Sequence, residues 1–310
     1  SLSDTKTFTV DITGVNDAPV ITSSEIATSI DENSGAGQVV YTVTSTDVDA
    51  SATVSYSLSG IDASLFTIDS TTGAVTLIAN PNFENKSNYS FNVIATDNGA
   101  LTDTKAVTLA INDVNDAPEG TVTISGTVTQ GQTLTASNNI TDADGMGTIS
   151  YQWYADGVLI NGAVNSTYTL TQNEVNKAIT VVASYTDVLG ANETVTSSPT
   201  EDVLNVNDAP IVSNNNIDVK LSFGDVYQKD VSGLFSDIDF DNVFTYEAIN
   251  LPLGLTMNSS TGVISGRANS SGEFKVIIKV TDNGTPALSV SRTYNMLVVA
   301  PPQVEISQNT

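Results

Sequence analysis

A short acidic motif occurs three times in the sequence, each time closed by a proline. It reads INDVNDAP at residues 111–118, with near-copies ITGVNDAP at 12–19 and LNVNDAP at 204–210. Each copy offers carboxylate, side-chain amide and backbone carbonyl oxygens, which are the ligands that calcium takes six to eight at a time. The proline limits the freedom of the segment. The motif is therefore predicted to be one part of a repeated calcium site.

Two further acidic patterns keep the register of this motif. Its aspartate before Ala-Pro recurs at spacings of 99 and 92 residues. After each copy comes an Asp-x-Asp pair, and 50, 45 and 45 residues beyond the start of the pair an aspartate ends a β-rich run. The pairs are Asp47 and Asp49, Asp142 and Asp144, and Asp237 and Asp239, and the later aspartates are Asp97, Asp187 and Asp282. Chance does not readily give this register, so we expect these aspartates to meet a linker at one end of each domain.

The segments between these motifs alternate in the manner of half-buried β-strands. In SFNVIATD, Phe91, Val93 and Ala95 point to one side and the intervening residues to the other. Turn signals such as STTG at 70–73 and SSTG at 259–262 are frequent, and no segment favours a long amphipathic helix. The spacing of the motifs corresponds to one β-sandwich per interval. The sequence therefore predicts an all-β fold of tandem β-sandwich domains in series.

The motifs also give the domain boundaries. We expect the last strand of a preceding domain at 1–18, and three β-sandwiches, the first, second and third domains, at 19–117, 118–209 and 210–300. Residues 301–310 are expected to begin a following unit. The linkers at 12–19, 111–118 and 204–210 then form the N-terminal, first and second junctions.

Composition excludes several functions. The chain has 35 Asp and Glu against 10 Lys and Arg, a formal net charge of −25, so it repels nucleic acid and anionic membranes and attracts cations. It has neither cysteine nor histidine, which excludes disulfides, zinc clusters, thiol catalysis and Ser-His triads. No apolar run approaches the roughly 18 residues that would span a bilayer, so this fragment is not expected to insert into a membrane. Every clustered carboxylate pair falls in the calcium register, and we therefore expect no enzyme.

The first domain resembles the cadherin family. DEN, DVD, LFTIDSTTGAVTL, PNFENKSNYSFNVIATDNG and INDVNDAP follow one another in cadherin order. Cadherin repeats bind calcium between successive domains through these elements. The resemblance implies that the first junction uses Glu32, Glu84, Asp113, Asn115, Asp116, Asp142, Asp144 and Asp187. Asn82 stands where cadherins usually have an aspartate, and the segment before Pro118 is one residue shorter, which favours one or two ions over three.

The same register implies two less complete sites. At the N-terminal junction Gly14 replaces the first acidic linker position, and the remaining candidates are Asn16, Asp17, Asp47, Asp49 and Asp97. At the second junction Asn205 replaces Asp113, and no glutamate equivalent to Glu32 is evident. The candidates there are Glu174, Asn207, Asp208, Asp237, Asp239 and Asp282. With fewer carboxylates this junction is expected to bind calcium more weakly.

The other two domains carry different resemblances. The second, with SYQWYADGVLINGA, resembles bacterial immunoglobulin-like domains, and Trp153 is expected to be a core residue of its central strand. The third, with LPLGLTMNSSTGVISG and FKVIIKVTDNG, resembles dystroglycan-type cadherin-like domains. This mixture resembles the large calcium-dependent repeats-in-toxin (RTX) adhesins of bacteria. The resemblance implies an extracellular, monomeric rod on the bacterial cell surface, stiffened by calcium and serving cell adhesion and biofilm formation.

Two functional alternatives stay open. The domains could be spacers only, or the third could bind a host or biofilm glycan or protein through Phe235, Phe240, Phe244 and Tyr246, although most of these aromatics are expected in the core. A different class of protein is an accessory glycan-binding or spacer module of a secreted polysaccharide-degrading enzyme.

Overall fold

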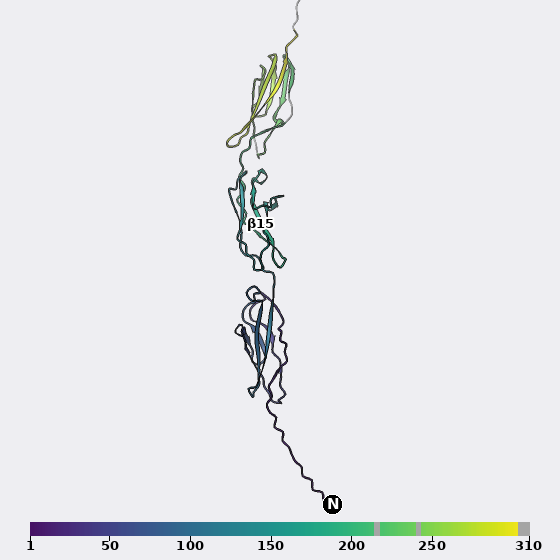
Figure 1. Cartoon of the computed structure of the whole chain (residues 1–310). Helices are drawn as coiled ribbons and strands as arrows, with labels where there is room; N and C mark the ends of the chain where they lie inside the picture. Colours follow the sequence, from purple (N-terminus) through teal and green to yellow (C-terminus); the bar gives the residue numbers. More distant parts are fainter. Residues whose placement is uncertain (214–217, 240–242, 303–310) are drawn as a thin grey trace, which may run out of the picture. The chain divides into compact units, whose positions relative to one another are not determined.

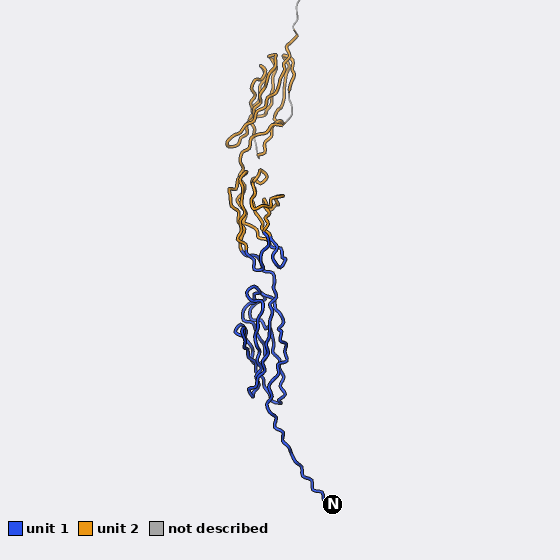
Figure 2. Tube along the Cα trace, in the orientation of Figure 1, with its two compact units in different colours: residues 1–119, 141–148, 185–193 blue, residues 120–140, 149–184, 194–310 orange. Residues whose placement is uncertain are grey.

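The computed structural model describes residues 1–213, 218–239 and 243–302 of the chain (Figure 1). Phe240 and most of the 301–310 segment lie outside the described residues. The chain forms two compact units (Figure 2). Unit 1 holds residues 1–119 together with 141–148 and 185–193, and unit 2 holds 120–140, 149–184 and 194–310.

The first domain, within unit 1, is a β-sandwich. Its four-stranded sheet runs β2 (Ile30–Asp31), β9 (Thr102–Asn112), β8 (Asn88–Thr96) and β5 (Ser55–Ser59). Its three-stranded sheet runs β3 (Gln38–Thr42), β7 (Ala74–Leu77) and β6 (Phe66–Ile68), and β1 (Val20–Ile21) pairs with β4 (Ser45–Thr46). The predicted alternation in β8 is confirmed, because Phe91, Val93 and Ala95 are buried in the core between the sheets.

The third domain, within unit 2, repeats this strand order. Its four-stranded sheet runs β18 (Val219–Ser222), β25 (Ser289–Val299), β24 (Gly272–Thr281) and β21 (Thr245–Ile249). Its three-stranded sheet runs β19 (Val226–Asp230), β23 (Val263–Arg267) and β22 (Leu255–Met257), and β17 (Ile211–Val212) pairs with β20 (Phe235–Ser236). In both domains the pair at one edge of the larger sheet is parallel, β2 with β9 and β18 with β25. In the first domain the edge strand β2 therefore lies beside β9, the strand that leads into the first junction.

The second domain has sheets of four and three strands. The larger runs β13 (Val158–Leu159), β12 (Ser150–Ala155), β15 (Ile179–Thr186) and β16 (Asn192–Thr196), and the smaller runs β10 (Val122–Ser125), β11 (Thr133–Asn138) and β14 (Thr167–Thr169). Trp153 on β12 is fully buried, and its indole N–H donates to the carbonyl of Asn165 at 2.8 Å. The expectation that Trp153 is a core residue is confirmed. The prediction of an all-β fold of serial sandwiches is likewise confirmed.

Helix is confined, in the described part of the chain, to three short 3₁₀ segments. They are η1 (Ala63–Leu65), η2 (Gln172–Glu174) and η3 (Ser232–Leu234). None of the helices among the described residues is long and apolar enough to cross a membrane. Residues 1–18 belong to no strand and their side chains are exposed, so their assignment to a preceding domain stays a prediction.

The turn before β7 offers a test of a single hydrogen-bonding side chain. Asp69 Oδ1 accepts the backbone N–H groups of Thr72 at 2.8 Å and Thr71 at 2.9 Å, and these bonds lower the pKa of Asp69. In the third domain the side-chain oxygen of Asn258 accepts the equivalent N–H groups of Ser260 and Thr261, both at 3.0 Å. An asparagine therefore supports the same turn without a charge.

Asp69→Ala is expected to lower the melting temperature near neutral pH, whereas Asp69→Asn changes it little. Because the folded pKa of Asp69 is depressed, its contribution is present above the unfolded pKa of about 3.9 and is lost as the pH falls through the folded pKa. Thermal melts between neutral and acidic pH should thus show a smaller acid-induced loss of stability in Asp69→Asn than in the wild type. Equal destabilisation by alanine and asparagine at neutral pH would contradict this role.

Candidate metal centres

The aspartates that end β8, β15 and β24 are buried and held by the loops that follow them. Asp97, Asp187 and Asp282 are 6%, 7% and 4% exposed. Asp97 Oδ1 accepts the N–H groups of Gly99 and Leu101, both at 2.8 Å. Asp187 and Asp282 accept equivalent bonds from Ala191 at 2.8 Å, and from Gly284 at 3.0 Å and Leu288 at 2.9 Å. Each loop fixes one carboxylate at the end of a central strand.

The pKa values of two of these aspartates reflect that anchoring. Burial of Asp97 and Asp282 favours the protonated acid, but the hydrogen bonds they accept outweigh it and lower the pKa of both. Among these hydrogen bonds, the one from the amide of Asn16 lowers the pKa of Asp97 most, and the one from the backbone N–H of Leu288 lowers the pKa of Asp282 most. Both groups are therefore held as carboxylates, the form that binds a cation.

The Asp-x-Asp pairs dock the linkers in one repeated geometry. In each pair the N–H of the second aspartate donates to Oδ1 of the first, at 2.9 Å in the N-terminal junction, 3.0 Å in the first and 3.1 Å in the second. The second aspartate then accepts the N–H of the linker aspartate. These contacts join Asp17 to Asp49 at 2.8 Å, Asp116 to Asp144 at 2.5 Å, and Asp208 to Asp239 at 2.7 Å. The structure thus brings the linker motif and the Asp-x-Asp pair together at all three junctions.

The first junction is centred on Glu32, which is 2% exposed. Its Oε2 accepts the N–H of Phe83 at 2.8 Å and its Oε1 accepts the N–H of Val114 in the linker at 2.9 Å. Glu32, Glu84 and Asp113 each place one carboxylate oxygen within 4.8 Å of the other two. Three carboxylates at this separation repel one another strongly unless a cation or protons offset their charge.

The pKa values at this junction record that repulsion. Burial raises the pKa of Asp113, and the charges of Asp144 and Glu32 raise it further. Burial and the same two charges raise the pKa of Asp116. The pKa of Glu84 is also raised, because burial and the charges of Glu32 and Asp113 outweigh a backbone hydrogen bond that lowers it. A divalent cation among these groups would convert the repulsion into attraction.

The unpartnered polar atoms test whether the residues fit calcium. Among the described residues, buried side-chain oxygen or nitrogen atoms without a hydrogen-bond partner occur on seven residues, and five of these are aspartates at predicted calcium positions. These are Asp47, Asp113, Asp144, Asp187 and Asp237. A buried carboxylate oxygen without a partner is costly, and hard oxygen ligands are what calcium prefers. The donor set therefore fits calcium, whereas the ligand role of each residue stays a prediction.

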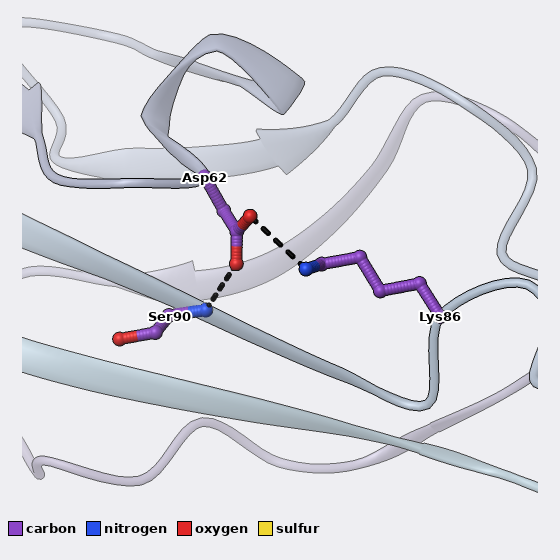
Figure 3. Close-up of polar contacts among 3 residues, drawn as sticks. All are labelled: Asp62, Lys86 and Ser90. Atoms are coloured by element: carbon purple, nitrogen blue, oxygen red, sulfur yellow. Dashed lines mark hydrogen bonds and ion pairs between the residues drawn. The ribbon is translucent and has the colours of Figure 1, made fainter.

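An ion pair braces the loop that carries Glu84 (Figure 3). The carboxylate of Asp62 accepts the N–H of Ser90 at the start of β8 at 2.8 Å and contacts Lys86 Nζ at 3.1 Å. Lys86 follows Glu84 by two residues, and its N–H donates to Asn82 O at 3.0 Å. Asp62 is 7% exposed, so this pair ties the Glu84 loop to the body of the first domain.

Four predicted ligands make hydrogen bonds of their own to neighbouring groups. Glu174 is 5% exposed, and its Oε2 accepts the N–H and the hydroxyl of Thr171 at 2.8 and 2.7 Å. It closes a capping box on η2, and the carboxylate cluster found among the described residues does not include it. The amide of Asn115 donates to Glu193 at 3.0 Å, whereas Asn16 and Asn207 donate to Asp97 at 2.8 Å and Asp282 at 3.1 Å.

Two residues of the first junction were missed by sequence reasoning. Asn33 donates to Asp116 at 2.9 Å, and Glu193 accepts the amide of Asn115. Asn33 belongs to the DEN segment, which already pointed to this end of the domain. Glu193 follows Asp187 by six residues, and no sequence pattern marks it.

The chain is thus built of serial β-sandwiches whose acidic linkers dock on paired aspartates. Comparison with protein families finds a Cadherin domain at residues 26–112 and a Putative Ig domain at 209–299. The chain therefore carries a cadherin repeat and an immunoglobulin-type repeat in tandem. The immunoglobulin-type match falls on the third domain, which the sequence likened to a dystroglycan-type cadherin-like domain.

The similar proteins are animal cadherins. Human Protocadherin Fat 1 is 29% identical over 326 residues, covering 94% of this chain and 7% of that protein. Mouse Protocadherin Fat 4 is 36% identical over 124 residues, covering 38% of this chain and 2% of that protein. The solved structure of Protocadherin Gamma B2 extracellular cadherin domains 1-5 is 22% identical with a TM-score of 0.47, covering 94% of this chain and 62% of that one. The chain thus spans only a small part of these curated relatives.

Proposed function

We propose that this chain is an extracellular segment of a cell-surface adhesin whose domain junctions are stiffened by calcium. One observation carries the proposal: among the described residues, every buried carboxylate oxygen that lacks a hydrogen-bond partner belongs to an aspartate of the junction register. The cadherin domain over residues 26–112 supports it, because the sequence elements of that domain supply Glu32 and Glu84 of the first junction.

The protein groups define what bound calcium would do. Glu32, Glu84 and Asp113 would hold an ion from the first domain and linker, and Asp142, Asp144 and Asp187 would hold it from the loops of the second domain. Bound calcium would offset the mutual repulsion of these carboxylates and would join the linker to both sets of loops. Because the set is assembled only in the folded chain, calcium binding adds to stability as the ion exceeds its Kd. The mechanical result is a segment with fixed interdomain angles, which we propose to be an extended rod.

The source and ligand of the adhesin are finer parts of the same proposal. The mixture of repeats favours a large bacterial RTX adhesin that serves attachment and biofilm formation, although the curated relatives are animal proteins. A glycan platform on the third domain gains no support from its aromatics. Phe235 and Tyr246 are buried in the core and Phe244 packs against it, while Phe240 lies outside the described residues. We therefore favour an extender over a glycan-binding module of a secreted enzyme.

Removal of calcium is expected to make the chain more flexible and less stable. Small-angle scattering in millimolar calcium should show a narrower distribution of conformations than in chelator, and calorimetry should show a higher melting temperature. Magnesium at the same concentration is the matched control, because its octahedral preference suits this carboxylate-rich, flexible set less well. Superposable scattering curves and melts in calcium and chelator would refute the proposed function.

A further inference from the structure

The second junction contains a residue in the structural position of Glu32. Gln130 donates its backbone N–H to Leu204 O at 2.9 Å, as Glu32 donates to Asn112 O at 3.1 Å. Gln130 Oε1 accepts the N–H of Val206 at 3.0 Å, as Glu32 Oε1 accepts the N–H of Val114 at 2.9 Å. Each acceptor carbonyl lies two residues before its linker valine, so the two side chains meet their linkers in the same register.

The two equivalent side chains differ in chemistry, because Glu32 is a carboxylate and Gln130 is an amide. The carboxylate of Glu32 belongs to a three-carboxylate cluster, whereas the Nε2 of Gln130 donates to Asp208 Oδ2 at 2.8 Å. An amide N–H₂ group is a hydrogen-bond donor and does not coordinate a cation. Where the first junction presents a ligand, the second presents a donor to one of its own carboxylates.

The other two members of the cluster are also replaced. Asn205 stands in the linker where the first junction has Asp113, and its amide donates to Asp239 Oδ1 at 2.8 Å. Glu174 matches Glu84 in spacing, but its carboxylate is committed to Thr171. None of the three counterparts therefore offers a carboxylate in the way that the first junction does.

Side-chain amides reach the carboxylates of the second junction from three positions. Gln130 and Asn205 contact Asp208 and Asp239, and Asn207 donates to Asp282 at 3.1 Å and to Pro286 O at 2.9 Å. Gly284 makes room for this, because a Cβ at that position would collide with the side chain of Asn207. The linker is thus fastened to the third domain by neutral donors, while Asp237 of the same junction keeps one buried oxygen, Oδ2, without a hydrogen-bond partner.

The cavity at the first junction has more acidic lining residues than the cavity at the second. The cavity at the first junction, about 450 Å³, is lined by Asp116, Glu119 and Asp142 together with amides. The cavity at the second junction, about 520 Å³, has Asp208 as its one acidic lining residue in the described part of the chain. Gln130 and Gln172 line it beside apolar side chains such as Leu170 and Ile211.

We propose that the second junction keeps its interdomain order without calcium, because Gln130 and Asn205 supply hydrogen bonds where the first junction needs an ion. This inference rests on the proposed function for its contrast with the first junction. Gln130 and Asn205 are positioning residues. Of these two junctions, the first is then the one whose interdomain order depends on calcium.

Paired spin labels on the full chain measure each junction separately, because the chain has no native cysteine. Labels at Thr67→Cys and Thr135→Cys report the first junction, and labels at Thr135→Cys and Ser291→Cys report the second. All three positions are exposed. Chelation should broaden the distance distribution of the first pair and leave that of the second unchanged. Equal broadening of both pairs would overturn the inference while leaving the proposed function intact.

Two variants complete the test. Gln130→Glu combined with Asn205→Asp gives the second junction the carboxylates that the first junction has at the equivalent positions. The distance distribution of the second pair of labels should then broaden in chelator and sharpen again in calcium. Calorimetry should count one more bound ion than in the wild type. Gln130→Ala should broaden the second pair with and without calcium, and an unchanged distribution would overturn the inference by itself. If the distance distribution of the first pair of labels is the same in calcium and in chelator, the proposed function is contradicted instead. The Gln130→Ala variant would still decide the inference.

Discussion

Asp113→Asn is expected to act in opposite directions with and without calcium. Burial of the Asp113 carboxylate and its repulsion by Asp144 and Glu32 raise the pKa of Asp113. In chelator the neutral amide avoids both costs, so the variant should be at least as stable as the wild type. In calcium the loss of one charged ligand should lower the affinity at least as much as the loss of a group that merely orients a ligand, which costs roughly 10- to 100-fold. That corresponds to about 1.4–2.7 kcal/mol of calcium-linked stability in excess ion.

The measurement is a pair of thermal melts, in calcium and in chelator, together with a calcium titration. Asp11→Asn is the matched control, because Asp11 is exposed and makes the same chemical change outside the junctions. A variant that loses the same stability in chelator as in calcium would show that Asp113 serves the fold and not the ion. The second junction already carries asparagine at this position, as Asn205.

Trp153→Ala is expected to cost the second domain about 3–5 kcal/mol, a large part of the stability of a typical domain. The indole is fully buried, packs 6.1 Å from the ring of Tyr168, and donates to Asn165 O. Truncation therefore leaves a cavity and a carbonyl without its donor. Denaturant unfolding followed by circular dichroism measures the loss, and the fluorescence of the single tryptophan reports the wild-type second domain alone.

Two comparisons make this result interpretable. Trp153→Phe should lose less, because most of the ring volume remains, and Val158→Ala should stay within about 0.5 kcal/mol, because Val158 is 70% exposed. Trp153→Ala should also weaken calcium binding at the first junction, since Asp142, Asp144 and Asp187 lie in the sequence of the second domain. Unchanged unfolding midpoints in Trp153→Ala would contradict the assigned core.

The sequence predicts the strands and the junction register well, because both depend on local pattern. The alternation of Phe91, Val93 and Ala95 follows from the two-residue period of a strand. The meeting of Asp116 with Asp144 follows from the repeated spacing of acidic motifs. Neither inference needs knowledge of how distant segments pair.

The second junction shows where local pattern is insufficient. Gln130 is equivalent to Glu32 only because its neighbour Thr129 forms an isolated parallel bridge with Leu204 before the linker, and the segment TQGQTL does not reveal that bridge. The ligand assignment of Glu174 relied on its 13-residue spacing from Asp187, which equals that of Glu84 from Asp97. Yet Thr171 and Glu174 form the T-x-x-E pattern of a capping box, a local signal that favours the structural role.

Unit 1 includes residues 141–148 and 185–193 of the second domain. The boundary between the two compact units therefore does not coincide with the boundary between the first and second sequence repeats. Each repeat accordingly carries two unlike half-sites, a receiving end with paired aspartates and a donating end with the linker. The second domain combines an acidic receiving end with an amide-rich donating end. Duplication or shuffling of whole repeats would therefore transfer the metal requirement of a junction with the repeat that precedes it. A chain could alternate ion-dependent and ion-independent joints simply by the order in which its repeats were assembled.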